Sequence, residues 1–147
     1  MQKLPHYYRV SANADLEGDV SLSSDGLETL PSAPPQEFGG PGDHWSPETL
    51  LIAAVADCFI LSFRAIAKAS KLSWLSLICD VEGTLDRSEG KIKFTEFKVN
   101  ATLDVPPDTN EQRAQRILEK AEASCLITNS LSGTTHLNAV VVVKPLS

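Results

Sequence analysis

Three cysteines and one glutamate are the residues of this 147-residue chain whose types and positions suit redox chemistry. Cys58 lies in a long apolar stretch, Cys79 in an alternating stretch, and Cys125 after a serine. Glu48 precedes Cys58 by ten positions on the same stretch. The cysteines form no CxxC pair, and the three histidines are scattered without metal-ligand spacing. We therefore expect thiol chemistry without a metal.

Two thiols are sufficient to reduce a peroxide. A thiolate attacks the distal oxygen and gives a sulfenic acid and an alcohol, after which a second thiol condenses with the sulfenic acid to form a disulfide. The attacking thiol needs a pKa that is lowered or matched to the working pH. Alternatively, Cys58 is only a small core residue, because a buried thiol without a charge partner is inert. Considered alone, the residue leaves both interpretations open.

Residues 46–69 predict one long helix around Cys58. Ser46 suits the N-cap, Pro47 the first helical position, and Glu48 the first turn, where the helix dipole favours negative charge. Charged side chains form one narrow stripe along this helix: Asp57, Arg64 and Lys68. Most of the remaining circumference is apolar and should be buried. The charges argue against a membrane span.

Glu48 raises a geometric question about any shared site. Ten residues of helix separate it from Cys58 by about 15 Å along the axis, so it cannot touch the Cys58 of its own chain. If both serve one site, Glu48 of one chain must meet Cys58 of a second copy, which predicts a homodimer with an apolar interface. Otherwise Glu48 only complements the helix dipole. A carboxylate alone would raise the thiol's pKa, so its useful role is to hold a cation or accept a proton. His44 is the nearest candidate cation, unless it is simply a loop residue.

The order of the predicted elements indicates a single α+β domain over residues 1–147. Alternation and turn residues predict weak antiparallel strands between residues 7 and 30, and a proline- and glycine-rich loop at 31–42. The later elements, in chain order, are a strand at 73–86, a hairpin turn at 87–91, a strand at 92–105 with a bulge near 95–97, a helix at 110–123, a short helix ending at Gly133, and a strand at 135–144 buried on both faces.

The predicted short helix begins next to Cys125. Ser124 is a plausible N-cap, and this would place Cys125 at the helix start, where the positive end of the dipole lowers a thiol's pKa. A capping box at Thr109 and Gln112 is expected for the helix before it. Cys79 shares the apolar face of its strand, so we interpret it as a core residue.

Bulk properties exclude several classes of protein. A net charge of -6 disfavours nucleic-acid binding, which needs a basic surface. An apolar content of 42% is typical of a globular protein, and an odd number of cysteines fits a reducing compartment. The N-terminal residues 1–10 are polar and contain no signal-peptide core. We therefore expect a cytoplasmic protein that binds neither nucleic acid nor membrane.

Two segments carry a resemblance to a known family. Ser46-Pro47-Glu48-x-Leu50-Leu51-x-Ala53-Ala54-x-Ala56-x-Cys58-Phe59 and Ala121-x-x-Ser124-Cys125-x-x-x-Asn129-Ser130 resemble the OsmC/Ohr family of osmotically inducible and organic hydroperoxide resistance proteins. The resemblance implies an intertwined homodimer, with antiparallel sheets around two long central helices, that reduces organic hydroperoxides through thiols. It makes Cys58 the peroxidatic cysteine, Cys125 the resolving one, and Glu48 the acidic residue of the site.

One departure from the family concerns charge. Efficient peroxidases of the family place an arginine before the central helix, beside the reactive thiol, but residues 10–63 contain no arginine. An apolar site without that cation should raise the pKa of Cys58. We therefore predict a slow thiol peroxidase whose activity rises toward alkaline pH, if the chain is an enzyme.

The expected reductant is an external dithiol, and we expect no bound cofactor. The alternative function is a noncatalytic OsmC-like protein that holds a small lipophilic ligand in the crevice around Cys58.

Overall fold

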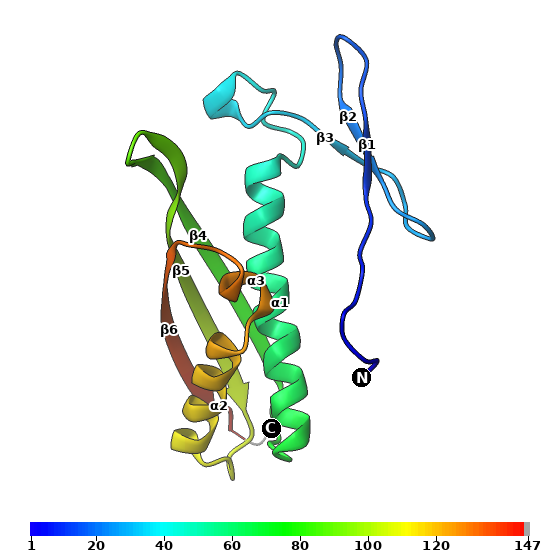
Figure 1. The fold of residues 1–147 in the computed structure, drawn as a ribbon. Helices are drawn as coiled ribbons and strands as arrows, with labels where there is room; N and C mark the ends of the chain where they lie inside the picture. Colours follow the sequence, from blue (N-terminus) through cyan, green and yellow to red (C-terminus); the bar gives the residue numbers. More distant parts are fainter. Residues whose placement is uncertain (146–147) are drawn as a thin grey trace. The chain divides into compact units, whose positions relative to one another are not determined.

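The computed structural model describes residues 1–145, and the chain divides into two compact units, Met1–Leu51 and the part that begins at Ile52. Helices and two three-stranded sheets confirm the α+β class (Figure 1). Each sheet is confined to one unit, since no strand of the first pairs with a described strand of the second. The single domain over residues 1–147 stays a prediction.

The N-terminal unit contains a small antiparallel sheet in the order β1-β2-β3. Its elements are β1 (Ser11–Asn13), β2 (Val20–Ser23), β3 (Leu30–Ser32) and the 3-10 helix η1 (Gln36–Phe38). The strand meander is therefore confirmed, but its first strand is much shorter than the alternation suggested, because β1 is exposed along its whole length. The proline-rich segment is not wholly irregular either: it contributes part of β3 and all of η1.

The long helix α1 (Pro47–Ala69) begins where the sequence predicted. The Thr49 N–H donates to the Ser46 hydroxyl at 3.1 Å, and the Ser46 N–H donates back to the Thr49 hydroxyl at 2.9 Å. This reciprocal pair satisfies N–H groups that the first helical turn leaves free. The cap therefore fixes the direction in which α1 leaves Ser46.

A Schellman motif ends α1. The Leu72 N–H donates to the Ala67 carbonyl at 2.9 Å, and the Lys71 N–H donates to the Lys68 carbonyl at 3.2 Å. Lys71 takes the left-handed conformation that such a motif needs, with φ of 56°. Leu72 is buried against the core, which is the hydrophobic contact typical of this ending. The chain then reverses and enters the second sheet.

The second sheet has the order β4-β5-β6. The elements of this unit after α1 are β4 (Ser76–Ser88), β5 (Lys91–Val105), α2 (Glu111–Ala123), α3 (Leu126–Asn129) and β6 (Thr134–Val143). The β4–β5 pair is an antiparallel hairpin, but β5 and β6 run parallel, in contrast to the expected antiparallel pairing. A parallel neighbour requires a crossover connection, and α2 with α3 supplies it.

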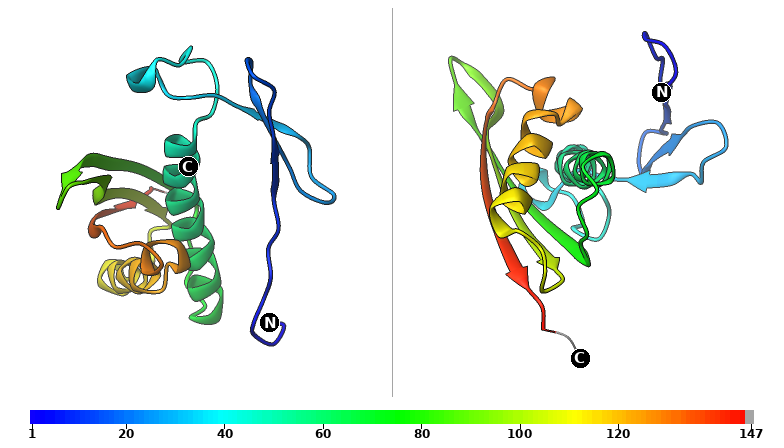
Figure 2. Two further views of the ribbon diagram at one scale, coloured as in Figure 1. Left: turned by 45° about the horizontal axis from the view of Figure 1, so that its top comes forward. Right: turned by 90° about the horizontal axis from the view of Figure 1, so that it is seen from below.

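The predicted bulge lies in β5. Thr84 pairs with Glu96 and Leu85 pairs with Phe94, so Thr95 is the extra residue. On the last strand the prediction was wrong, since β6 alternates between exposed and partly buried residues instead of being buried on both faces. The reason is that α1 and α2 cover only one face of the sheet (Figure 2).

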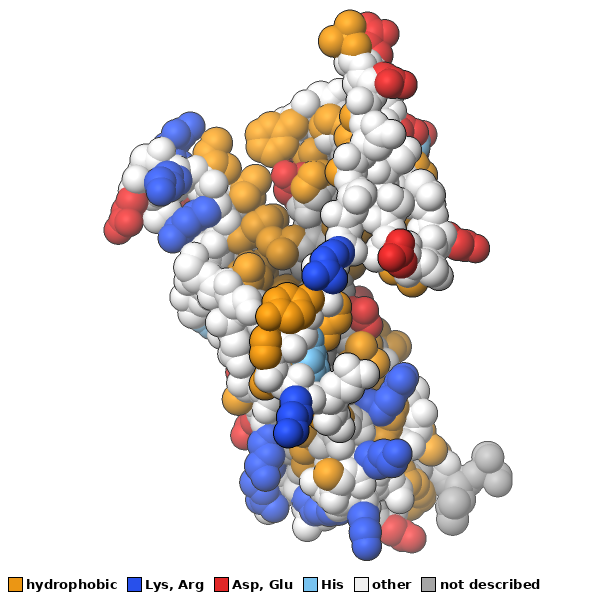
Figure 3. Space-filling model, turned by 45° about the vertical axis from the view of Figure 1, so that its right-hand side comes forward, with side chains coloured by type: hydrophobic (Ala, Val, Ile, Leu, Met, Phe, Trp, Pro, Cys, Tyr) orange, Lys and Arg blue, Asp and Glu red, His pale blue; other side chains and the backbone are white. Residues whose placement is uncertain are grey.

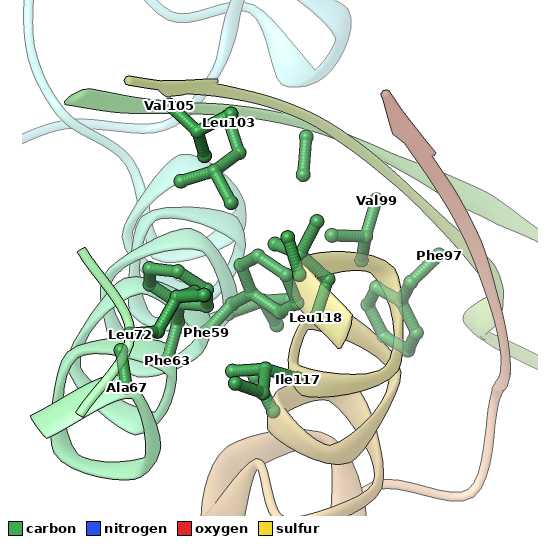
Figure 4. Packing of buried hydrophobic residues seen from close by; sticks show 14 residues of the cluster. Phe59, Phe63, Ala67, Leu72, Phe97, Val99, Leu103, Val105, Ile117 and Leu118 are labelled. Carbon is green, nitrogen blue, oxygen red and sulfur yellow. The ribbon is translucent and has the colours of Figure 1, made fainter. Parts of the chain in front are cut away.

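The core lies between this sheet and the helices. Side chains from α1, α2 and β5 point toward one another, including Phe59, Phe63, Leu118, Val99 and Leu103 (Figure 4). Gly83 of β4 allows a close approach, because a Cβ there would lie 2.3 Å from Cδ1 of Ile52. The helix α1 therefore packs directly against β4.

Within one chain α1 is far less buried than its composition suggests. Only Val55, Phe59, Phe63 and Ala67 are fully buried on it, one on each successive turn. A window of 18 residues on α1 passes the length and composition test for a membrane span, and 22% of that window is buried. Apolar side chains accordingly remain on the surface of the single chain (Figure 3).

Candidate active site

Cys58 lies near the middle of α1 and is partly exposed in the single chain. The same helix places Ser62 one turn later, with its hydroxyl 3.9 Å from the Cys58 sulfur. A hydroxyl in this position can donate to the thiolate form of Cys58. The site is therefore built first from two residues of one helix face.

Cys125 lies between α2 and α3 and is 1% exposed. It is the N-cap residue of α3, with an extended backbone, and the Asn129 N–H donates to its carbonyl at 3.0 Å. Ser124 is instead the C-cap of α2, so its predicted role as the cap of the short helix was wrong. Asn110, and not Thr109, caps α2, because its side chain accepts from the Arg113 N–H.

The structure brings Cys58 and Cys125 together. Burial raises the pKa of Cys58, but the Ile127 N–H, the Cys125 thiol, the Ser62 hydroxyl and the Leu126 N–H interact with its sulfur and lower that pKa. The donors outweigh burial, and the pKa of Cys58 lies below its ordinary value. The predicted rise in this pKa was therefore wrong, because the donors come from a segment distant in sequence.

Two of these donors, the N–H groups of Leu126 and Ile127, were not named in the sequence analysis. They are the first two residues of α3, whose N–H groups have no partner inside the helix. The sequence did predict a helix start beside Cys125, but the expected lowering of a thiol pKa was assigned to Cys125 itself. Only the packing of α3 on α1 shows that these groups act on Cys58.

Cys79 of β4 faces the core side of the sheet, as predicted. Burial, with smaller contributions from the charges of Asp80 and Cys125, raises the pKa of Cys79 to about 11. The three cysteines are all free. Cys79 is thus a protonated thiol at neutral pH.

Glu48 lies in the first turn of α1, within the N-terminal unit. Its Oε1 atom is buried and finds no hydrogen-bond partner among residues 1–145. The same side chain lines a cavity of about 490 Å³, together with apolar residues that include Val20, Leu22 and Phe38. A buried carboxylate oxygen without a partner is costly, so the described chain leaves one acceptor of Glu48 unsatisfied.

His44 is more than a loop residue, because it is held between two carboxylates of its own unit. Its Nε2 lies 3.0 Å from Oδ2 of Asp19, and its Nδ1 lies 2.6 Å from Oδ1 of Asp43. The hydrogen bond to Asp43 raises the pKa of His44 against the opposing effect of burial, and the charge of Asp19 adds to the rise. The raised pKa favours the protonated form of His44, so His44 stays the candidate cation next to the start of α1.

No group of three or more metal-binding side chains comes together within residues 1–145. Residues 1–145 therefore contain no candidate set of metal ligands. The expectation of no bound cofactor stays a prediction.

The comparisons with known proteins identify the family of this chain. The family described as OsmC-like protein matches residues 40–139. The chain belongs to this OsmC-like family. The matched segment contains the long helix and both cysteines of the candidate site.

Relatives of this OsmC-like protein are similar over almost its whole length. An uncharacterised protein of Bacillus subtilis, YmaD, is 25% identical over 143 residues, which cover 95% of both chains. An organic hydroperoxide resistance protein of Xanthomonas axonopodis pv. citri is 27% identical and covers 90% of this chain and 91% of its own. The crystal structure of the organic hydroperoxide resistance protein OsmC of Legionella pneumophila is 27% identical, with a TM-score of 0.74, and covers 95% of this chain and 99% of that one.

Proposed function

We propose that this OsmC-like protein is a thiol-dependent peroxidase that reduces organic hydroperoxides through Cys58 and Cys125. The observation that carries the proposal is the convergence of the Cys125 thiol and the N–H groups of Leu126 and Ile127 on the Cys58 sulfur. A lowered thiol pKa with a second thiol at hand is what peroxide reduction requires. Relatives named for organic hydroperoxide resistance support the substrate class.

The proposed cycle uses two electrons. The Cys58 thiolate attacks the distal peroxide oxygen, the O–O bond breaks, and the alcohol leaves with a proton. The Cys125 thiol then attacks the sulfenic acid, which releases water and leaves a Cys58–Cys125 disulfide. An external dithiol returns two electrons and two protons and restores both thiols. Because the N–H donors of α3 stabilise the thiolate, the cycle does not depend on an arginine in residues 10–63.

We further propose a cytoplasmic homodimer in which Glu48 of one chain serves the site of a second copy. Two observations support it: the low burial of α1 within one chain, and the buried Glu48 oxygen without a donor. Burying the apolar surface of two α1 helices against each other is typical of obligate dimers, which bury more than about 2,000 Å². Light scattering at micromolar concentration should give the mass of two chains, and a monomer would contradict this arrangement.

The alternative is a noncatalytic protein that binds a small lipophilic ligand. The cavity beside Glu48, with mainly apolar walls, is the observation that favours it, although Cys58, around which the sequence placed the ligand, does not line this cavity. The two functions differ in their thiol count. A peroxidase loses two free thiols per chain with one equivalent of cumene hydroperoxide, whereas a binding protein keeps all three.

The pH dependence of the same reaction tests the thiolate directly. We expect the rate constant for oxidation of Cys58 by cumene hydroperoxide to reach its plateau at a lower pH than an ordinary cysteine would allow. The measurement is the second-order rate from pH 5 to pH 10. A rate that only begins to rise above pH 9 would mean that the donors of α3 do not stabilise Cys58.

A further inference from the structure

The N-terminal unit contains a cavity of about 490 Å³ that the thiol chemistry does not use. Every residue that lines it belongs to Met1–Leu51, so the cavity is a property of this unit alone. One face of the small sheet forms the first wall, where Ala12 stands opposite Leu22, and Val20 stands opposite Ser32. Val20 and Leu22 are the partly buried positions of β2, so this wall is mainly apolar.

The proline-rich segment and the first turn of α1 provide the other walls. Pro34 and Phe38 line the cavity from the proline-rich segment. The Ala33 N–H donates to the Trp45 carbonyl at 2.9 Å and ties this segment to the start of the helix. Gly40 packs against the Pro34 carbonyl so closely that a Cβ would have no room. Backbone contacts thus hold the walls, and the cavity is preformed, as ligand sites usually are.

Glu48 is the one charged side chain among the described residues that line the cavity. Its Oε1 atom is buried and has no hydrogen-bond partner within residues 1–145. A buried carboxylate is costly unless an opposite charge or a donor compensates it. The cavity therefore combines apolar walls with one acidic group that lacks compensation.

The basic side chains of the same unit are engaged elsewhere, and none of them lines the cavity. Arg9 lies over the ring of Tyr7, with its Cζ atom 5.9 Å from the ring centroid, and His44 is held by two aspartates. The unit contains two Lys and Arg residues but eight Asp and Glu residues, so its formal charge of -6 equals that of the whole chain. This negative charge attracts cations from solution.

We propose that the cavity binds a lipophilic amine in its protonated form. The ammonium group lies beside the Glu48 carboxylate and compensates its charge, and the alkyl chain lies along Val20, Leu22 and Phe38. The apolar walls select the chain, whereas the carboxylate selects a cation over a neutral alcohol or a fatty acid. This binding site is separate from the thiol pair, because neither Cys58 nor Cys125 lines the cavity.

A series of ligands with the same chain tests the charge on the wild-type protein. Calorimetric titration at pH 7 should show that octylammonium binds at least about tenfold more tightly than 1-octanol, because a charged hydrogen bond replaces a neutral one. Octanoate should bind more weakly than octanol. Hexylammonium should bind about tenfold more weakly than octylammonium, since it buries two fewer CH₂ groups. Equal affinity for octylammonium and octanol would overturn the proposal.

Two variants separate Glu48 from the general charge of the unit. Glu48→Gln keeps the shape of the side chain and should weaken octylammonium about tenfold while octanol binds as before, which also shows that the cavity is intact. Glu37→Gln removes the same charge from an exposed residue of η1 outside the cavity and should change the affinity less than about twofold. Equal weakening by both variants would contradict a site at Glu48. If Glu48→Gln does not fold, the ligand series on the wild type decides.

The position of the ligand is tested by NMR of methyl-labelled protein. Octylammonium should shift the methyl signals of Val20 and Leu22 and leave Leu61, an exposed side chain of α1, unchanged. Shifts at Leu61 without shifts at Val20 and Leu22 would mean that the amine coats exposed apolar surface as a detergent does, and would overturn the site. No binding at all would mean that a second copy already fills the cavity or compensates Glu48, and would overturn it as well.

The amine site does not rest on the proposed peroxidase, and the two can fail separately. Cys58→Ser should bind octylammonium within about twofold of the wild type. If cumene hydroperoxide leaves all thiols intact while octylammonium binds at Val20 and Leu22, the peroxidase fails and the amine site stands. If the hydroperoxide consumes two thiols while octylammonium does not bind, the amine site fails and the peroxidase stands.

Discussion

The surroundings of Cys58 and of Cys79 show how one fold treats two thiols of the same unit in opposite ways. Both are partly buried, and burial raises the pKa of each. Around Cys58 the hydroxyl of Ser62 and the N–H groups of α3 reverse that effect, whereas around Cys79 the nearby charges of Asp80 and Cys125 add to it. Burial alone therefore does not decide whether a thiol is reactive; the groups that face its sulfur decide it.

The largest effect on activity should come from replacing each of the two thiols in turn. Cys58→Ser should reduce hydroperoxide consumption to background, because no activated nucleophile remains. Cys79→Ser should change the first turnover by less than about twofold and cost about 1 kcal/mol of stability, because a hydroxyl replaces a thiol in the core. Peroxide assays and thermal unfolding measure both. Equal inactivation by the two changes would contradict the contrast between the sites.

Cys125 has two roles in this comparison, as a donor to Cys58 and as the resolving thiol. Cys125→Ala should raise the pKa of Cys58, and both Cys125→Ala and Cys125→Ser should allow one turnover and then leave Cys58 open to oxidation to sulfinic acid. Cys125→Ser keeps a donor and should change the pKa less. Thiolate absorbance against pH and intact-protein mass give the two readouts. A second fast turnover in the serine variant would exclude Cys125 as the resolving thiol.

Ser62 offers a smaller change of the same kind. Ser62→Ala removes one of four donors, so the pKa of Cys58 should rise, but by less than in Cys125→Ala. Ser70→Ala, at the end of α1 and remote from Cys58 in sequence, is the matched control. The pH at which alkylation of Cys58 is half-maximal measures the effect. An unchanged midpoint would show that Cys125 and the N–H groups of α3 stabilise the thiolate without Ser62.

The bulge at Thr95, the bounds of α1 and the apolar face of β4 could be predicted from sequence, because each depends on local alternation or on a cap. The parallel pairing of β6 could not be predicted, since the run of valines from Val140 to Val143 has no pattern that distinguishes a parallel from an antiparallel neighbour. The candidate cysteines were found from the sequence segments around them. The direction of the pKa shift of Cys58 was not predicted, because it depends on Leu126 and Ile127, whose N–H groups interact with the sulfur only after α3 packs on α1.

The N-terminal unit provides the smallest expected effect. The raised pKa of His44 stabilises the fold fully below the unfolded pKa of histidine, and this contribution is lost as pH rises through the folded pKa. The lowered pKa of Asp43 contributes above the unfolded pKa of aspartate and is lost as pH falls. The advantage of the wild type over His44→Gln should therefore be largest between about pH 4 and pH 6.5. Unfolding midpoints measured from pH 4 to pH 9 check this, and a constant difference would contradict it.

The parallel β5–β6 pair also determines when during folding the site is assembled. The β4–β5 hairpin joins residues that are near in sequence, so it can form early, whereas β6 must return across the whole α2–α3 crossover to reach β5. Pairings of high contact order form late because loop-closure entropy opposes them. Cys58 and Cys125 are separated by 67 positions, so we expect their contact to form late as well. We therefore expect Cys58 of an incompletely folded chain to lack the donors of α3 and to have a pKa nearer to that of an ordinary cysteine.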